Sequence, residues 1–236
     1  MKAPKRGFDR LAYWYRALEV LAFGNDLERA RFRYLQRLSD RRDILLLGEG
    51  DGRCAERLAA AAPRARILCV DSSPGMIERA ARRIARAGAS ERVSFLCADA
   101  VTFTPETGRH DAVTTLFFLD CFDGATASGI VSRVSAALRP DALWAFADFV
   151  LPKGRLARLR ARVWLGILYA FFRWETGLRV SELPPSEEIL AREGWRRVDS
   201  VDLQWGLVRS VLLTRGGTGA TGALSASASP ETRASR

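Results

Sequence analysis

The residues best suited to bind a reactive ligand follow a short apolar run. Residues 44–47 lead directly into Gly48-Glu49-Gly50-Asp51-Gly52-Arg53. Glycines at alternate positions between a strand and a helix let the backbone turn tightly, and they let a ligand approach where a Cβ atom would clash. Because Glu49 and Asp51 make the loop acidic, it should repel a pyrophosphate and attract a cationic ligand.

Two further carboxylates follow later apolar runs. Asp71 ends the second run, 19 residues after Gly52, where an acidic residue can bind ribose hydroxyls. Asp99, followed by Ala100, ends the third run, where a carboxylate could bind an adenine amino group or a neighbouring backbone N–H. The loop lacks the GxGxxG of nicotinamide and flavin sites and the GK[ST] of a phosphate loop. S-adenosylmethionine (SAM) carries adenosine, a sulfonium and an amino group but no phosphate, so the charges favour SAM over NAD, FAD or ATP.

Candidates for catalysis are acidic residues near the ends of later strands. Asp120 follows the expected strand 111–118, and Asp148 lies near the end of 142–149. Either could orient or deprotonate a substrate, or could instead cap a helix or pair with an arginine. His110, the only histidine, precedes a strand, so we expect a surface or turn residue at the opposite edge from the ligand. Without a histidine base, transfer to a ring carbon or an amine is favoured over base-driven O-methylation.

Strands and helices alternate along the middle of the chain. This pattern predicts an α/β fold with a doubly wound, mostly parallel seven-stranded sheet and the last strand antiparallel. The expected strands are residues 43–47, 66–70, 93–97, 111–118, 142–149, 197–204 and 207–214. The expected helices are residues 53–62, 74–87, 125–138 and 186–193.

The remaining segments form the expected domain organisation. Residues 1–42 are predicted to be an N-terminal helical cap, with helices over 8–23 and 27–38. Residues 43–215 form the SAM-binding domain, with a helical cap insertion over 152–183 after the fifth strand. Residues 216–236 are small, polar and without pattern, which predicts a disordered tail.

The excess of positive over negative charge lies in two segments. The 236 residues carry a net charge of +10, with +6 on residues 1–42 and +6 on residues 152–180. Both segments are also rich in aromatic residues. This combination suits a surface that meets an anion, a nucleic acid or a membrane. It suits equally two ordinary amphipathic helices whose arginine side chains face water.

Other function classes lose support on composition. The four cysteines form no CxxC pair, so a zinc site or a disulfide framework is not expected, and we predict buried free thiols. The N-terminus has no secretory signal pattern, and the longest apolar run, Val163–Phe172, is too short to span a bilayer. These features predict a cytoplasmic protein.

The sequence resembles the class I SAM-dependent methyltransferases. The motifs that carry the likeness are ILLLGEGDGR (44–53), CVDSSPGMIERAARR (69–83), FLCADA (95–100), DAVTTLFFLDCF (111–122) and LWAFADF (143–149). The resemblance implies that Gly48, Gly50 and Gly52 hold the amino-acid part of SAM. It implies that Asp71, with Ser72 beside it, binds the ribose, that Met76, Asp99 and Ala100 surround the adenine, and that Phe117 lies beside the cofactor. The family usually has an acidic residue at the position of Leu46, so Glu49 and Asp51 are expected to take over part of its role.

A narrower likeness concerns the acceptor. The segments 8–24, 147–152 and 188–213 resemble the ubiquinone/menaquinone C-methyltransferases, which act on lipid-tailed rings. The favoured function is therefore methylation of a small apolar or lipid-tailed acceptor, with peripheral contact to an anionic membrane. The alternatives are an RNA-modifying methyltransferase, although no NPPY-like or cysteine-nucleophile signature is present, and a SAM-binding regulator without catalysis.

Overall fold

Seven strands form one mixed sheet. The computed structural model describes residues 25–152, 154 and 183–215. The strand order is β3-β2-β1-β4-β5-β7-β6, and β7 runs antiparallel to the other six strands of this sheet. The strands are β1 (Asp43–Leu47), β2 (Arg66–Asp71), β3 (Val93–Cys97), β4 (Ala112–Leu116), β5 (Leu143–Phe149), β6 (Trp195–Leu203) and β7 (Val208–Arg215). The prediction of a mostly parallel sheet with the last strand antiparallel is confirmed.

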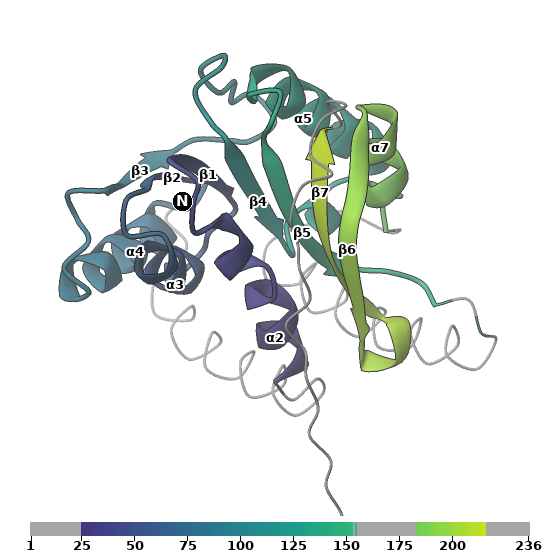
Figure 1. Cartoon of the computed structure of the whole chain (residues 1–236), viewed down its shortest axis with the longest axis horizontal. Coiled ribbons are helices and arrows are strands. Elements are labelled where there is room, and N and C mark those ends of the chain that lie inside the picture. The colour runs from purple at the N-terminus through teal and green to yellow at the C-terminus, as the bar shows by residue number, and fades with distance from the viewer. Residues whose placement is uncertain (1–24, 153, 155–182, 216–236) are drawn as a thin grey trace, which may run out of the picture.

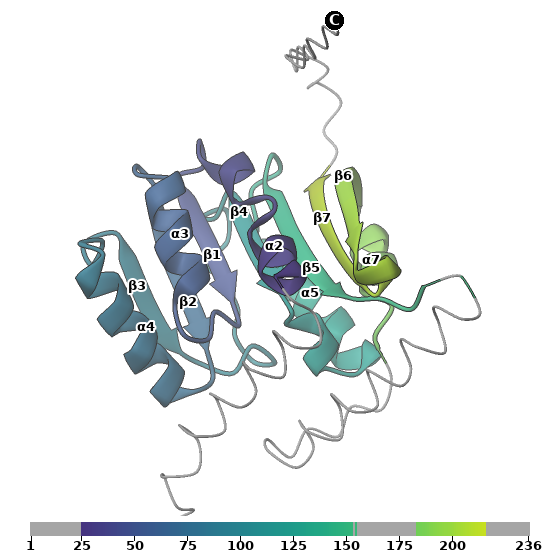
Figure 2. The same ribbon diagram turned by 90° about the horizontal axis from the view of Figure 1, so that it is seen from below.

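Helices cover both faces of this sheet (Figures 1 and 2). On one face lie α2 (Asp26–Phe32), α3 (Arg53–Ala61) and α4 (Pro74–Arg86), and on the other lie α5 (Gly124–Ala137) and α7 (Ser186–Arg192). Because side chains alternate along a strand, Ile44 and Leu46 pack toward α3 and α4, whereas Leu45 and Leu47 pack toward α5. All of β1 is therefore buried, as a central strand covered on both sides must be.

Side-chain hydrogen bonds fix where the helices begin. Ser73 Oγ accepts from the Met76 N–H at 3.4 Å at the start of α4, and Asp123 accepts from the Thr126 N–H at 2.8 Å at the start of α5. Each bond satisfies an N–H group that has no partner within the helix. Both helix starts are thereby held at the edge of the sheet where the parallel strands end.

The N-terminal region differs from its prediction. The expected helix over 27–38 is divided into α2, which ends at Phe32, and the 3₁₀ helix η1 (Leu35–Leu38). The tighter helix places Leu35 and Leu38 in the core beneath α3. The predicted helix over 8–23, most of the predicted helical insertion over 152–183 and the predicted tail over 216–236 lie outside the described residues. The cap therefore remains a prediction.

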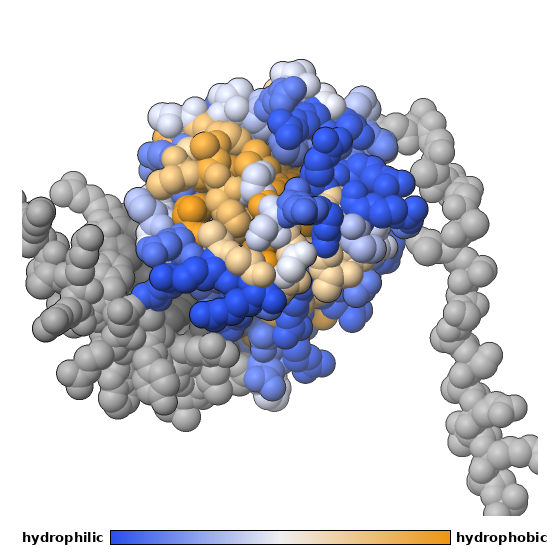
Figure 3. All heavy atoms as spheres, turned by 90° about the vertical axis from the view of Figure 1, so that its left-hand side faces the viewer, coloured by the Kyte–Doolittle hydropathy of each residue, from blue (hydrophilic) through white to orange (hydrophobic). Residues whose placement is uncertain are grey.

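Hydrophobic side chains reach the surface on the side where the outermost strand, β3, lies (Figure 3). Leu96, at the end of β3, is 39% exposed, and Val101, in the following loop, is 38% exposed. These residues flank Asp99 and Ala100. The end of the predicted site that should hold an adenine therefore borders an apolar surface.

Candidate cofactor and catalytic site

The candidate site lies where β1 and β4 end side by side at the centre of the sheet. From β1 the chain crosses to β2 on one side, whereas β4 continues to β5 on the other. In open α/β sheets, ligands bind outside the carboxyl ends of the strands at this point of reversal. The Gly48–Gly52 loop, Asp71 and Asp120 all follow strands at this edge.

The three glycines of the loop have different surroundings. All have positive φ angles, of 70°, 68° and 88°. A Cβ on Gly48 would lie 2.2 Å from Phe118 Cδ2, and one on Gly52 would lie 2.7 Å from Ala80 Cα. A Cβ on Gly50 would meet no atom of the described residues within 4 Å. Gly48 and Gly52 therefore permit close packing of the protein, whereas Gly50 faces open space that a ligand could fill.

Asp71 connects the loop to the next helix. Its Oδ2 accepts from the Gly50 N–H at 3.0 Å, and its Oδ1 accepts from the Ser73 N–H at 2.8 Å. A carboxylate has about four acceptor positions, so it retains capacity for ribose hydroxyls. Asp71 thus positions the loop, a role that was not predicted. Its predicted role in binding the ribose stays a prediction.

The other predicted adenine contacts lie along the same edge. Asp71 pairs with Cys97 across β2 and β3, which brings the loop after β3 next to it. In this loop the exposed Asp99 accepts from the Val101 N–H at 2.9 Å, and Ala100 is half-buried. Met76 lies half-buried in the first turn of α4.

The two acidic side chains of the loop have different environments. Glu49 Oε1 accepts from the Ala55 N–H at 2.8 Å at the start of α3. Burial raises the pKa of Glu49 to about 8, against the opposing effects of this hydrogen bond and of Arg31. Asp51 instead forms ion pairs with Arg53 at 3.2 Å and with Arg83 at 3.4 Å. Of the two acidic side chains in the loop, Glu49 is therefore the one that forms no ion pair with an arginine of the described residues, while Leu46 lies in the core.

Arg31 is a residue of the site that the sequence reasoning missed. It projects from α2, with its guanidinium carbon 5.3 Å from the centre of the Phe117 ring. Burial raises the pKa of both Glu49 and Asp120, and the charge of Arg31 opposes this rise in each. Arg31 therefore lies near both the loop and the end of β4. The signal was helical spacing, because Leu27, Ala30 and Tyr34 are buried and Arg31 lies beside that stripe.

Phe117 has a strained backbone at the end of β4. Its φ angle is 56°, in the region that residues with a side chain rarely adopt. The Phe117 N–H donates to the Ala147 carbonyl at 2.7 Å, and the ring contacts Phe149 at 5.3 Å between centroids. Such strain is concentrated at functional sites, and here it turns the chain sharply between β4 and η2 (Leu119–Cys121).

Asp120 and Asp148 form a buried carboxyl pair. Asp148 is 1% exposed, and its Oδ2 accepts from the Asp120 N–H at 3.1 Å. Burial, together with Asp120, raises the pKa of Asp148 well above its usual range, and burial also raises the pKa of Asp120. The charge of Asp120 contributes to the shift of the Asp148 pKa, so the two carboxyl groups interact directly. In the described residues neither carboxylate forms an ion pair with an arginine, but Asp148 accepts an N–H from the first turn of the 3₁₀ helix η2, which is the capping role that the sequence had left open.

His110 lies at the opposite edge, at the start of β4, as predicted. The expectation of a surface position is wrong, because the side chain is only 2% exposed. Burial, assisted by the charge of Arg109, lowers its pKa and favours the neutral imidazole. The expectation of buried thiols holds for Cys54 and Cys69, whereas Cys97 is exposed and Cys121 is half-buried.

The described residues contain neither a membrane-spanning helix nor a metal-binding cluster. None of the helices combines the length and hydrophobicity that a bilayer span requires. No group of three or more His, Cys, Asp or Glu side chains in this part of the chain is arranged to hold a metal ion.

The strand order matches the Rossmann-like fold of methyltransferases of known structure. Residues 44–141 match the family described as a methyltransferase domain. The methyl donor of this class is SAM. A comparison with curated proteins finds no match.

Solved structures share the fold at low sequence identity. The mitomycin 7-O-methyltransferase MmcR is 19% identical with a TM-score of 0.62, and the match covers 82% of this chain and 55% of that one. The N-methyltransferase NodS from Bradyrhizobium japonicum, in complex with S-adenosylhomocysteine (SAH), is 19% identical with a TM-score of 0.59, covering 81% and 88%. An O-methyltransferase family 2 protein from Planctomyces limnophilus, in complex with apigenin, is 16% identical with a TM-score of 0.59, covering 75% and 52%. The chain thus spans little more than half the length of several structures that it matches.

Proposed function

We propose that this chain is an enzyme that transfers a methyl group from SAM to a small-molecule acceptor. The observation that carries the proposal is the open space at Gly50, bordered by Glu49 and Asp71 and formed without a phosphate-binding motif. A nucleoside with a cationic sulfur and an ammonium group fits this edge better than a dinucleotide, because Glu49 has no arginine ion pair there and a cation beside it would favour its charged form against the effect of burial, which raises its pKa to about 8.

The proposed cofactor contacts follow the sequence prediction, with one addition. They are Gly48, Glu49, Gly50, Asp51, Gly52, Asp71, Ser72, Met76, Asp99, Ala100 and Phe117. Asp51 contributes through the shape of the loop, since its carboxylate is bound to Arg53 and Arg83. We add Arg31, whose guanidinium lies over Phe117 and can bind the carboxylate of the methionyl group.

The proposed catalytic groups are Asp120 and Asp148. When bound, SAM supplies a methyl group on a cationic sulfur, and its transfer leaves a neutral thioether while the acceptor loses one proton. Burial raises the pKa of both Asp120 and Asp148, which makes either carboxylate a better acceptor for that proton. A neutral amine or an activated ring carbon loses its proton readily once methylated, so we propose N- or C-methylation. His110, at the opposite edge, takes no part.

The acceptor is proposed to be apolar, and a lipid-tailed ring of the ubiquinone/menaquinone type stays within that proposal. The cap segments 1–42 and 152–183, and their contact with an anionic membrane from the cytoplasm, also remain proposals. Most of these residues lie outside the described part of the chain, so their support is the charge and aromatic pattern of the sequence.

The test is methyl transfer from radiolabelled SAM to a panel of amines, activated phenols and quinone precursors. Wild-type protein should label at least one acceptor, and Asp148→Asn should reduce kcat by about 10²-fold, the usual contribution of a positioned acid or base. Asp141→Asn is the control, since Asp141 is exposed and lies before β5 at the opposite edge. Full activity of Asp148→Asn would exclude the carboxyl pair from catalysis, and SAH binding without any labelled acceptor would favour a regulator.

A further inference from the structure

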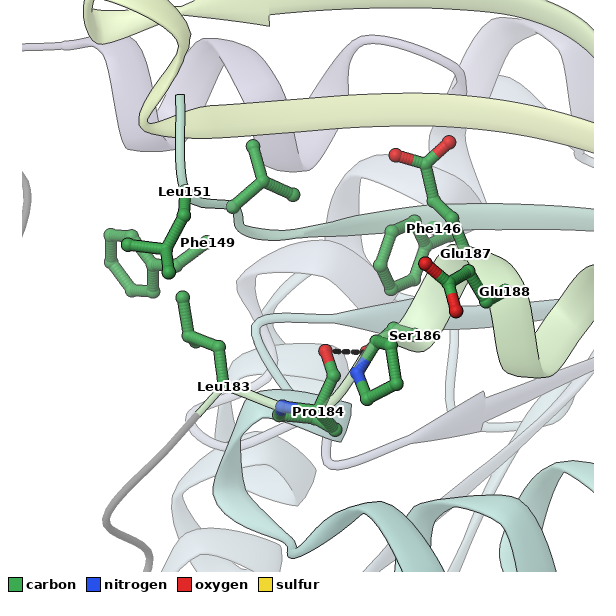
Figure 4. A pocket seen from close by; sticks show the side chains of 10 residues that line it. Phe146, Phe149, Leu151, Leu183, Pro184, Ser186, Glu187 and Glu188 are labelled. Carbon is green, nitrogen blue, oxygen red and sulfur yellow. Dashed lines mark hydrogen bonds between the residues drawn. The ribbon is translucent and has the colours of Figure 1, made fainter. Parts of the chain in front are cut away.

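A cavity of about 370 Å³ lies between the end of β5 and the start of α7 (Figure 4). Its walls are mainly apolar and include Phe146, Phe149, Leu151 and Leu183, with Pro184 at its base. A cavity of this size lies within the range of small-molecule sites, which are typically apolar with a few polar groups. None of the cofactor contacts proposed above lines it.

The cavity adjoins the proposed catalytic groups. Phe149 lines it, and the same ring contacts Phe117, which lies beside the cofactor site. Phe146 also lines it, and because side chains alternate along a strand, Asp148 lies on the same face of β5 two residues further on. One cavity wall is therefore continuous with the end of β4, and the lining residues Phe146 and Phe149 flank Asp148 along β5, although Asp148 itself does not line the cavity.

The charges at the cavity are compensated. One oxygen of Glu187 accepts from Arg209 at 2.8 Å, and the other accepts from Arg197. The Glu188 side chain is 73% exposed and extends toward solvent. Near the cavity, Asp148 Oδ1 is buried and has no hydrogen-bond partner among the described residues, so it can take part in a further hydrogen bond. The cavity therefore suits an uncharged ligand with one hydrogen-bonding group.

Resting on the function proposed above, we infer that this cavity is the acceptor site and that it selects a neutral, flat, largely apolar molecule with a single amine or hydroxyl group. A phosphate, a carboxylate or a fixed cation would lose hydration on entering and would gain no unpaired counter-charge. The polar group of the acceptor would point toward Asp148, and the apolar body would pack between Phe146 and Leu183.

The test measures binding rather than turnover. SAH-saturated protein is titrated by calorimetry with β-naphthol, β-naphthyl phosphate and β-naphthylmethylammonium, which share one ring system and differ in charge. We expect β-naphthol to bind at least tenfold more tightly than either charged probe. Equal or tighter binding of a charged probe, or no saturable binding of β-naphthol, would overturn the inference.

A pair of matched variants locates the binding. Leu151 lines the cavity and is 46% exposed, so Leu151→Trp should fold and fill the space, lowering β-naphthol affinity at least tenfold. Val198 on β6 is 45% exposed and does not line the cavity, so Val198→Trp should bind β-naphthol like wild type. Leu183→Trp is a second filling variant in case the first is unstable. Unchanged β-naphthol binding in a folded filling variant contradicts the inference.

The same titrations separate this inference from the proposed function. All three tryptophan variants should bind SAH as wild type does, because the cavity lies outside the proposed cofactor contacts. If wild-type protein fails to bind SAH, the methyltransferase proposal fails whatever the probes do. If SAH binds and the filling variants leave β-naphthol binding unchanged, only the acceptor assignment fails.

Discussion

Each glycine of the Gly48–Gly52 loop has a different neighbour, which makes their contributions separable by mutation. Gly52 lies against the backbone of Ala80, and Gly48 lies against the Phe118 ring. Gly50 has no atom from the described part of the chain near the position of a Cβ. Stability and ligand binding should therefore respond differently along one short loop.

Gly50→Ala should reduce stability by roughly 1–2 kcal/mol, the cost of a left-handed backbone for a residue with a side chain. It should lower SAH affinity more than tenfold, because the new methyl group occupies the ligand space. Gly52→Ala should cost about 3 kcal/mol or more, since its Cβ would also strike Ala80. Urea denaturation and calorimetry measure both effects, and a Gly50→Ala variant that binds SAH normally would place the ligand elsewhere.

Glu49 should make stability depend on pH. Its pKa rises from 4.5 to about 8 on folding, so the folded protein retains a proton that the unfolded chain releases. The resulting stability is complete below about pH 4.5 and is lost as the pH rises toward 8. Glu49→Gln keeps an oxygen for the Ala55 N–H and has no proton to lose. Its stability relative to wild type should increase by roughly 3–4 kcal/mol between about pH 5 and pH 8. A difference that does not change with pH in denaturation experiments would refute the raised pKa.

Arg31 should contribute to binding only through the carboxylate of the ligand. Arg31→Gln should weaken SAH binding about tenfold, the loss of one charge-assisted hydrogen bond, and should leave 5′-methylthioadenosine, which lacks the amino-acid part, unaffected. The control is Arg29→Gln, because Arg29 lies on the exposed side of α2 and pairs with Asp26. Equal losses for both ligands in calorimetry would mean that Arg31 acts through the fold.

Residue-level prediction from the sequence succeeded where a local motif defined the position. The glycine loop, Asp71 and Asp99 each follow an apolar run, so their common edge could be predicted. Arg31 and the pairing of Asp120 with Asp148 could not, because these contacts join elements far apart in the sequence. Periodicity shows that Arg31 lies beside a buried stripe, but it does not show which strand end the stripe covers.

At the scale of elements, the start of β1 is joined to the start of β4. Asp111 accepts from the backbone N–H groups of Arg42, at 2.9 Å, and Asp43, at 3.0 Å, and is only 5% exposed. These bonds lie at the edge of the sheet opposite the candidate site. They should therefore affect stability and have little effect on binding.

Asp111→Ala should lower the free energy of unfolding by roughly 2–3 kcal/mol, because it leaves two N–H groups without their carboxylate acceptor. SAH affinity should change less than twofold as long as the variant is folded. Denaturation and calorimetry on one preparation check both statements. A large loss of affinity at unchanged stability would show that this joint also shapes the ligand edge.

Prediction of elements succeeded best where burial is strongest. The apolar run of β1 was expected, and so was α4, which begins at Pro74 and ends shortly before Gly88. Continuous apolar runs and turn residues are local signals. The break between α2 and η1 was not expected, because Leu35 and Leu38 fit a continuous helix equally well by spacing. Packing beneath α3 decides between the two.

At the scale of the whole molecule, the strand order brings the β1 loop and the end of β4 together at the centre of the sheet. Alternating strands and helices predicted a parallel sheet, and the final hairpin predicted one reversed strand. The insertion of β7 between β5 and β6 could not be derived from alternation alone. It matters for the site because β7 supports β5, which carries Asp148.

The most direct test is a calorimetric titration of wild-type protein with SAH and, separately, with NAD. The account predicts one saturable site for SAH, in the micromolar range typical of small-molecule ligands, and no measurable heat from NAD. Absence of SAH binding, or tighter binding of the dinucleotide, would contradict it.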